Sequence, residues 1–417
     1  MSPTPRAAAA LGAIALLTIV FGPPVAALLA AALAGALIAD ARAARRPPRA
    51  QRRVPAIVAR GVPATLAVEP APDDGRRMRI RQARPAAEVE ISPQESDVGT
   101  LHSELVARRR GRFELAPATL RARGPLGLAT CDHVAGEAQE LLVYPDLPAA
   151  RRLALAVRTG SFRESGHRSR GPLGLGTDFE SIRDYLPDDD IRQVNWPATV
   201  RMGRPMSNQY RVEQDRDVIC MIDCGRLMAA PLMNATRLDL AIDAATAVGL
   251  VADELGDRCG TIAFDTVVHR RLAPRRRGGD ALVRAVFDLQ PAPVDSDYEL
   301  AFATVASAKR ALVIVFTDLI EEVAARSLIE AVPVLARRHE VVVAGVLDPD
   351  LDAAVGARPE HVLDVYRAAA ALDVLAARER AAARVRGAGA RVLETPPAGL
   401  ARAAVAAYLS AKARARL

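Results

Sequence analysis

Aromatic residues and cysteines are scarce in this chain of 417 residues. Phe, Trp and Tyr together make up 4% of it, and Trp196 is the single tryptophan. The four cysteines are scattered and have no histidine pair nearby, which disfavours both a disulfide framework and a zinc site. They are Cys131, Cys220, Cys224 and Cys259. We expect them to be reduced and mostly buried, as is usual in the cytosol.

Two further absences narrow the functional classes. Clusters of Lys and Arg with interleaved aromatic residues are missing, and the net charge of +7 is modest for this length. The sequence therefore predicts no nucleic-acid binding. The six histidines are also scattered, and no Ser-His-Asp or Cys-His set can be assembled around them. We therefore predict no catalytic residues and expect that the protein is not an enzyme.

The N-terminal region contains a long segment without charge, residues 7–39, in which Gly22, Pro23 and Pro24 interrupt the apolar run. A double proline breaks a helix, so the segment predicts two short helices joined by a turn. This transmembrane hairpin is assigned to residues 1–40. A single kinked span and a cleaved signal peptide are the alternatives.

The residues that follow the apolar segment indicate its orientation. A basic juxtamembrane linker, residues 41–53, carries six arginines, whereas Arg6 lies on the other flank. The six are Arg42, Arg45, Arg46, Arg49, Arg52 and Arg53. Under the positive-inside rule both ends of a hairpin then lie in the cytoplasm. The arginines also favour contact with membrane lipid, because anionic headgroups attract them.

The soluble part is long enough for two units. Residues 54–147 contain short segments that alternate apolar and polar side chains, the pattern of half-buried antiparallel strands, and predict a small β-sandwich. From Asp217 onward, continuous apolar runs alternate with helical periodicity. This pattern predicts an α/β fold over residues 217–417 with a doubly wound, mostly parallel sheet. The intervening residues, 148–216, form a separate segment.

That intervening segment carries the densest motif of the chain. Residues 177–201 combine an acidic triplet, arginines and the Val194-Asn195-Trp196 element, and an apolar run ending on Asp223 follows. The triplet is Asp188, Asp189 and Asp190, and the arginines are Arg183, Arg192 and Arg201. Together with residues 108–115, 124–128 and 143–145, this region resembles the bacterial domain of unknown function 58 family. The resemblance extends over nearly the whole chain.

The resemblance implies an architecture and a partner. It implies a Rossmann-type, von Willebrand factor A-like domain over residues 217–417, anchored in the bacterial inner membrane with its soluble domains facing the cytoplasm. It also implies association with a MoxR-type AAA+ ATPase. The function expected from it is a non-enzymatic protein-interaction module in protein maturation or envelope-related assembly. A metal-dependent hydrolase and a purely structural membrane protein are the alternatives.

Domains of the von Willebrand A type bind Mg²⁺ through two aspartates at strand ends and hydroxyls in the first loop. Here Asp223 and Asp318 match the aspartates, and Asp297 or Ser296 is a candidate for the loop ligand. Residues 225 and 227 are glycine and leucine, so two oxygen ligands are missing and the site is degenerate. Two interpretations follow: a weak Mg²⁺ site, or a metal-free edge in which the guanidinium of Arg226 replaces the cation. The second is favoured.

The acidic and tryptophan residues also have two interpretations. One interpretation is a docking surface for a partner, formed by Arg183, Arg192 and Trp196 together with the acidic triplet. The other is that the same residues pin the segment against the A-like domain. Burial of the large indole and pairing of adjacent carboxylates with arginines favour the second. Under that hypothesis Trp196→Ala lowers the unfolding free energy by about 3–5 kcal/mol.

Overall fold

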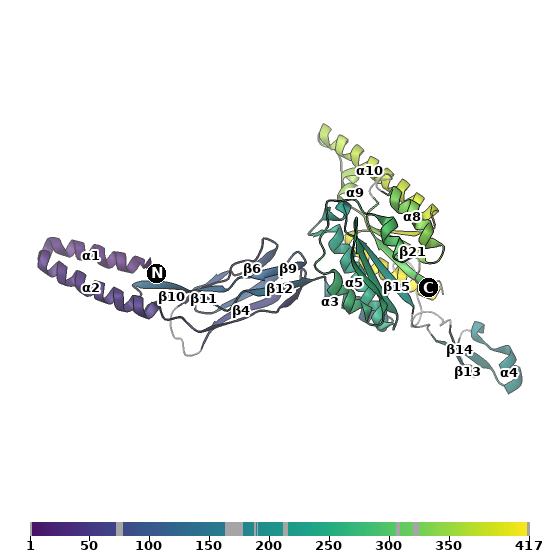
Figure 1. Ribbon diagram of the computed structural model, residues 1–417, viewed down its shortest axis with the longest axis horizontal. Helices are drawn as coiled ribbons and strands as arrows, with labels where there is room; N and C mark the ends of the chain where they lie inside the picture. Colours follow the sequence, from purple (N-terminus) through teal and green to yellow (C-terminus); the bar gives the residue numbers. More distant parts are fainter. Residues whose placement is uncertain are drawn as a thin grey trace. The chain divides into compact units, whose positions relative to one another are not determined.

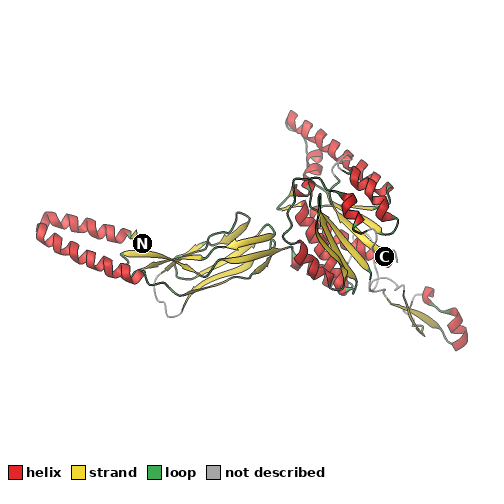
Figure 2. Ribbon diagram, in the orientation of Figure 1, coloured by secondary structure: helices red, strands yellow, loops and turns green. Residues whose placement is uncertain are grey.

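The computed structural model describes residues 2–71, 78–162, 178–186, 189, 191–211, 216–305, 309–319 and 325–414. These residues form two compact units, Met1–Tyr144 and Pro145–Leu417 (Figure 1). The first unit contains two helices and several small sheets, and the second is a mixed α/β unit (Figure 2).

The first unit begins with the predicted helix pair. Helices α1 (Pro5–Phe21) and α2 (Pro23–Ala44) contact each other and are separated by Gly22. Gly22 has a φ of 77°, which favours glycine, and the proline that follows it suits the first turn of a helix. Within the described residues, α2 is the one helix long and apolar enough to cross a membrane. At 22 residues, about 33 Å, it is longer than expected, because it continues past Asp40.

Twelve strands are formed by the described residues of the first unit. They are β1 (Ser2–Pro3), β2 (Ala50–Arg53), β3 (Ile57–Ala59), β4 (Ala64–Pro70), β5 (Met78–Arg81), β6 (Val89–Ser92), β7 (Glu95–Ser96), β8 (Leu101–Ala107), β9 (Gly111–Leu115), β10 (Ala118–Arg123), β11 (Ala129–Ala135) and β12 (Gln139–Tyr144). They form sheets ordered β1-β11-β10-β5-β7, β2-β4-β8-β6 and β3-β12-β9. Alternate side chains of all three sheets share one apolar core, which includes Leu66, Leu105, Leu120 and Leu141.

The boundaries differ from the predicted ones at the start of this unit. Residues 41–44 belong to α2 and residues 50–53 to strand β2, so residues 45–49 make the connection. Arginine side chains do not prevent either element, because they extend from an exposed face into solvent.

The foot of the helix pair is bonded to the sheet by a group that we call the hairpin clamp: Asp40 and the backbone amides of Leu126, Leu128 and Ala129. The Asp40 carboxylate is buried and accepts these three N–H groups at 2.7, 2.7 and 2.8 Å. Gly124 lies against it, and a Cβ there would overlap the carboxylate. Two more hydrogen bonds join the helices to the same region, Thr4 Oγ1 to Gly127 O and His133 Nε2 to Ala44 O.

The second unit contains a six-stranded sheet ordered β19-β18-β15-β20-β21-β22. Its strands are β15 (Asp217–Asp223), β18 (Arg258–Phe264), β19 (Val268–Arg275), β20 (Ala311–Phe316), β21 (Glu340–Val346) and β22 (Arg391–Thr395). All pairs are parallel except β18–β19. Since β18 and β20 lie on opposite sides of β15, the direction of winding reverses at β15, which makes its carboxyl end a switch point.

Helices cover both faces of this sheet. They are α3 (Leu147–Arg158), α5 (Arg237–Glu254), α6 (Gly278–Val286), α7 (Tyr298–Ala303), α8 (Arg326–Ala336), α9 (Pro349–Gly356), α10 (Val362–Gly387) and α11 (Leu400–Ala413). Short elements are η2 (Arg226–Ala229), β16 (Pro231–Leu232), β17 (Ala235–Thr236) and η3 (Pro397–Gly399). Cys220 and Ile222 of β15 pack in one core with α5 and α11, and Ile219 and Met221 in the other with α8 and α10. Burial on both faces explains the continuous apolar strands.

The segment that carries the dense motif forms a small structure of its own, which we call the arm: described residues 178–211. It consists of β13 (Asp178–Asp184), η1 (Ile191–Gln193), α4 (Trp196–Met202) and β14 (Met206–Arg211). Strands β13 and β14 pair antiparallel, and β14 also contacts α4 and η1.

Candidate functional site

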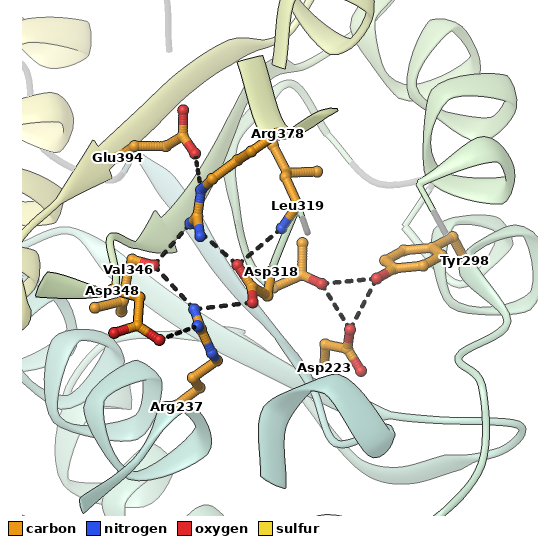
Figure 3. Close-up of polar contacts among 10 residues, drawn as sticks. Asp223, Arg237, Tyr298, Asp318, Leu319, Val346, Asp348, Arg378 and Glu394 are labelled. Atoms are coloured by element: carbon orange, nitrogen blue, oxygen red, sulfur yellow. Dashed lines mark hydrogen bonds and ion pairs between the residues drawn. The ribbon is translucent and has the colours of Figure 1, made fainter. Parts of the chain in front are cut away.

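The two aspartates predicted to meet at the carboxyl edge of the sheet are present there and are buried. Asp223 ends β15, and Asp318 lies two residues beyond the end of the neighbouring strand β20. Their exposed fractions are 2% and 4%. Figure 3 shows both carboxylates and several of the groups that contact them, among them Tyr298, Arg237 and Arg378.

Each oxygen of the Asp223 carboxylate accepts two hydrogen bonds. Oδ2 accepts from Tyr298 Oη at 2.8 Å and from Thr317 Oγ1 at 2.6 Å, and these hydroxyls are 2.7 Å apart. Oδ1 accepts from Gly225 N at 2.7 Å and from the hydroxyl of Ser296. Burial, and then the negative charge of Asp223, raise the pKa of Tyr298 well above its ordinary value, so this phenol keeps its proton and donates it.

Asp318 is held between two arginines from opposite faces of the sheet. Arg237 begins α5, directly after the N-cap Thr236, which forms a capping box with Asp239, and its Nη1 is 2.8 Å from Asp318 Oδ2. Arg378 comes from α10, and its Nη2 is 3.0 Å from Oδ1. The backbone N–H of Leu319 also donates to Oδ1 at 3.0 Å. The Arg237 contact is an ion pair without hydrogen-bond geometry, because Oδ2 has no hydrogen bond.

Further acceptors complete the group that we call the edge cluster: Asp318, Arg237, Arg378, Glu394, Asp348 and the carbonyl of Val346. Val346 O accepts from Arg237 at 2.9 Å and from Arg378 at 2.7 Å. Glu394 accepts from Arg378 Nε at 2.5 Å, and Asp348 lies 3.5 Å from Arg237. The cluster therefore joins β20, β21 and β22 to a helix on each face (Figure 3).

Burial and charge oppose each other inside this cluster. Burial raises the pKa of Asp318, while Arg378 and Arg237 act in the opposite direction. Burial also lowers the pKa of Arg237, although a guanidinium stays charged in proteins. The two buried cations are matched by three carboxylates, so each charged group has a partner.

The donor set does not fit a divalent cation. All four lone-pair directions of Asp223 are used by protein donors, and two guanidiniums occupy the space beside Asp318 where a cation would need to approach. A Cβ at Gly225 would overlap the Ser296 hydroxyl, so position 225 has no room for a serine ligand. Within the described ranges no three His, Cys, Asp or Glu side chains gather closely enough to hold a metal ion.

Two site predictions are therefore wrong. Asp297 does not join the aspartates: its side chain caps α7 by accepting from Leu300 N at 2.9 Å. Arg226 does not replace the cation either, because it is half exposed and pairs with Asp295 at 2.5 Å. The guanidiniums beside Asp318 are Arg237 and Arg378 instead. Arg226 begins η2, three residues after the end of β15.

The arm presents a different kind of surface. Six of its large apolar side chains are exposed to solvent. They are Ile182 (41%), Leu186 (54%), Ile191 (70%), Trp196 (64%), Val200 (82%) and Met202 (55%). Trp196 is the first residue of α4, directly after the helix cap Asn195, whose Oδ1 accepts from Ala198 N at 2.9 Å. Asn195 Nδ2 also donates to Asn208 of β14 at 2.7 Å. The motif residue beside the tryptophan is thus structural.

This exposure corrects the prediction that Trp196 is a buried anchor: α4 contains no buried residue. Arg183 and Asp189 do form a bidentate ion pair, with distances of 2.8 and 2.6 Å. That pair, and then the N–H of Leu186, lower the pKa of Asp189. Asp188 and Asp190 lie outside the described residues, as does the side chain of Arg192.

Sequence reasoning missed Arg237, Arg378, Tyr298 and Glu394. They are spread over more than 150 residues of a chain rich in arginine, and no local motif connects them. The one available signal was the Thr236–Asp239 capping pattern, which fixes the start of α5 and so places Arg237 at the carboxyl edge.

Comparisons with known proteins agree with part of the resemblance. The family model described as protein of unknown function DUF58 matches residues 181–386, which include most of the arm and most of the edge cluster but not the first unit. Uncharacterized proteins of Mycobacterium bovis (Mb1516) and Mycobacterium tuberculosis (MT1527 and Rv1480) are 24% identical over 182 residues. This region is 42% of the chain and 56% of each relative, so the chain spans about half the length of the curated relatives it matches.

Proposed function

We propose that this chain is a non-enzymatic protein-interaction module, anchored in the bacterial cytoplasmic membrane by α1 and α2 with its soluble units in the cytoplasm. The arm is its docking surface for a partner. The resemblance stated from the sequence favours a MoxR-type AAA+ ATPase as that partner, and protein maturation or envelope-related assembly as the process. A von Willebrand A-like fold for the second unit is part of the proposal, supported by the strand order and by the switch point at β15.

The observation that carries the proposal is the exposed apolar surface of the arm. A two-stranded hairpin is marginally stable alone, and apolar side chains that gather on such a surface usually mark a protein contact. Tryptophan is also among the residues most enriched at the centres of interfaces. By contrast, the carboxylates of Asp223 and Asp318 are both engaged by protein donors or cations, so the geometry gives the hydrolase alternative no support.

The proposal predicts that Trp196→Ala separates binding from stability. Because the indole is 64% exposed, we expect the substitution to change the unfolding free energy by less than about 1 kcal/mol. Loss of a tryptophan at an interface centre costs about 2 kcal/mol or more, so affinity for the ATPase should fall at least roughly 30-fold. The affinity of the full chain in detergent for a MoxR-type ATPase and its thermal unfolding would be measured together.

Tyr366→Ala is the matched control, because Tyr366 is an aromatic residue of similar exposure, 70%, on α10. It should leave binding unchanged. If Tyr366→Ala weakens binding and Trp196→Ala does not, the arm is not the docking surface. If neither variant nor the unmodified chain binds the ATPase, the alternative of a purely structural membrane protein gains weight.

The membrane part of the proposal has its own test. With Arg6 on one flank and the arginines of residues 42–53 on the other, both ends of the helix pair should stay in the cytoplasm. A reporter enzyme active only in the cytoplasm, fused after Leu417, should therefore be active, and the chain should keep its full length in the membrane fraction. Activity of a periplasm-dependent reporter at the same position would contradict this orientation.

A further inference from the structure

The foot of the helix pair contains a polar cavity that the proposed docking function does not use. Its volume is about 500 Å³, and strands β1, β5, β10 and β11 supply its walls. Three arginines and three hydroxyl-bearing side chains are among the lining residues: Arg79, Arg121, Arg123, Ser2, Thr4 and Thr130. The hydroxyls of Ser2 and Thr130 are 3.0 Å apart. These hydroxyls are engaged within the protein, because Thr130 Oγ1 can donate to Ser2 Oγ or, at 3.3 Å, to Ser2 O, and Thr4 Oγ1 donates to Gly127 O at 2.7 Å.

Two arginines at this place lie side by side without a counter-charge. Arg6 Nη1 and Arg123 Cδ lie 3.2 and 3.6 Å from the point where a Cβ on Gly127 would stand, so both side chains cover the same glycine. Both residues are exposed, and within the part of the chain that the structure describes neither has an ion-pair partner. Since neighbouring like charges repel, an anion between these two guanidiniums would be stabilised by both.

The other two arginines of the cavity are already neutralised. Arg79 pairs with Glu95 and, at 3.3 Å, with Asp97, whereas Arg121 pairs with Asp132 at 2.6 Å. The excess positive charge of the cavity therefore lies on the side of Arg123 and Arg6. It faces the start of α1, since Thr4 and Pro5 also line the cavity.

The depth of this site follows from helix geometry. The apolar segment begins at Ala7, two residues after Pro5, which is a rise of about 3 Å. The headgroup region of a bilayer is roughly 5–8 Å thick on each side of the hydrocarbon core. If the helix pair spans the membrane, Arg6 and the mouth of the cavity lie among phospholipid headgroups. The hairpin clamp holds the helices and the cavity in one fixed arrangement.

We propose that Arg6 and Arg123, beside this polar cavity, bind the phosphodiester of an anionic phospholipid headgroup at the foot of the helix pair. Guanidinium forks match phosphate oxygens in geometry and charge. The inference rests on the proposed membrane anchorage, and it extends that proposal from general attraction to one defined lipid site.

The experiment uses the full chain extracted in detergent and exchanged with either phosphatidylglycerol or phosphatidylethanolamine. Native mass spectrometry would count the phospholipid molecules retained by each protein. We expect one phosphatidylglycerol to be retained preferentially, and Arg6→Gln combined with Arg123→Gln to weaken its retention at least tenfold. Arg112→Gln is the matched control, because Arg112 is an exposed arginine of the same unit that does not line the cavity. It should retain the lipid as the unmodified chain does.

Three outcomes would overturn the lipid site. The double variant could retain phosphatidylglycerol as well as the unmodified chain does, or the Arg112 control could lose as much lipid as the double variant. The unmodified chain could also retain phosphatidylethanolamine as well as phosphatidylglycerol. Displacement of the lipid by millimolar inorganic phosphate would also overturn the lipid site, because the arginines would then bind free phosphate as well as they bind a headgroup. Cell fractionation separates this failure from that of the anchorage. A double variant that stays in the membrane and retains its lipid contradicts the lipid site alone, whereas an unmodified chain absent from the membrane fraction contradicts the anchorage itself.

Discussion

Replacing Arg378 with alanine should lower the unfolding free energy of the second unit by about 3–5 kcal/mol, the cost of removing one partner from a buried ion pair. Arg378 is 3% exposed and contacts Asp318, Glu394 and the carbonyl of Val346. Its loss leaves the buried carboxylate of Asp318 and the partly buried carboxylate of Glu394 with fewer cations, and the carbonyl of Val346 with fewer donors. For a unit of this size the melting temperature should fall by roughly 6–20 °C.

A matched control lies on the same helix. Arg386 pairs with Glu379 at 2.8 Å, but both side chains are largely in water, with 46% and 68% exposed. Arg386→Ala should therefore change stability by less than about 0.5 kcal/mol. Arg378→Lys keeps the charge but loses the planar guanidinium that contacts Asp318, Glu394 and Val346 together. Its loss of stability should therefore lie between those of Arg378→Ala and Arg386→Ala. The stability of all three variants would be measured by thermal unfolding in detergent, monitored through susceptibility to a protease. Equal small effects at 378 and 386 would show that the edge cluster does not stabilise the unit.

The second large effect is expected at the hairpin clamp. Asp40→Ala removes the acceptor of three backbone N–H groups, of which that of Ala129 belongs to a buried residue and that of Leu128 to a partly buried one. Orphaned amides of this kind cost roughly 1–3 kcal/mol each, so we expect a loss of about 3–5 kcal/mol in the docking of α2 on the sheet. Hydrogen exchange at residues 124–130 and proteolysis at residues 45–49 should both accelerate.

The conservative variant sharpens this test. Oδ2 accepts two of the N–H groups and Oδ1 accepts one, so the single amide oxygen of Asp40→Asn can keep the pair from Leu128 and Ala129. Its NH₂ group would then face the N–H of Leu126. We expect an intermediate loss, mostly confined to Leu126. Arg42→Ala, an exposed change on the same helix, should have no effect. Rapid exchange already present in the unmodified chain would contradict a stable clamp.

The sequence predicted the elements well wherever a periodic pattern was long enough. The three apolar runs at residues 218–222, 311–316 and 341–346 are strands of the sheet, and the break at Gly22 separates two helices. Strands β18 and β22 were missed, because Arg258 and Arg391 begin short runs that periodicity alone does not separate from their surroundings. Helix α3 was also missed, since its buried face consists mostly of small residues such as Ala150 and Ala154.

The candidate site was predicted only in part, for a physical reason. Strand-end aspartates can be found from sequence, because a carboxylate directly after an apolar run lies at a sheet edge. The partners of such a carboxylate come from helices that are distant in the chain, and long arginine side chains reach them from many starting positions. Arg226, the nearest arginine in sequence, was therefore the natural candidate, although Arg237 and Arg378 make the contacts. Exposure of Trp196 was equally hidden, because a lone aromatic residue is usually buried.

The hairpin clamp also sets an order of events during synthesis. Asp40 leaves the ribosome 86–89 residues before the amides that it binds. At about 5–20 residues per second, this interval is roughly 4–18 s. In the proposed membrane orientation, the helix pair would have entered the bilayer within this interval. The carboxylate of Asp40 would then lie at the membrane surface, solvated by water. In that orientation, the sheet would complete its fold after the helix pair has been inserted, and the β10–β11 turn would then close onto Asp40. A delay in insertion would leave Leu128 and Ala129 without their acceptor.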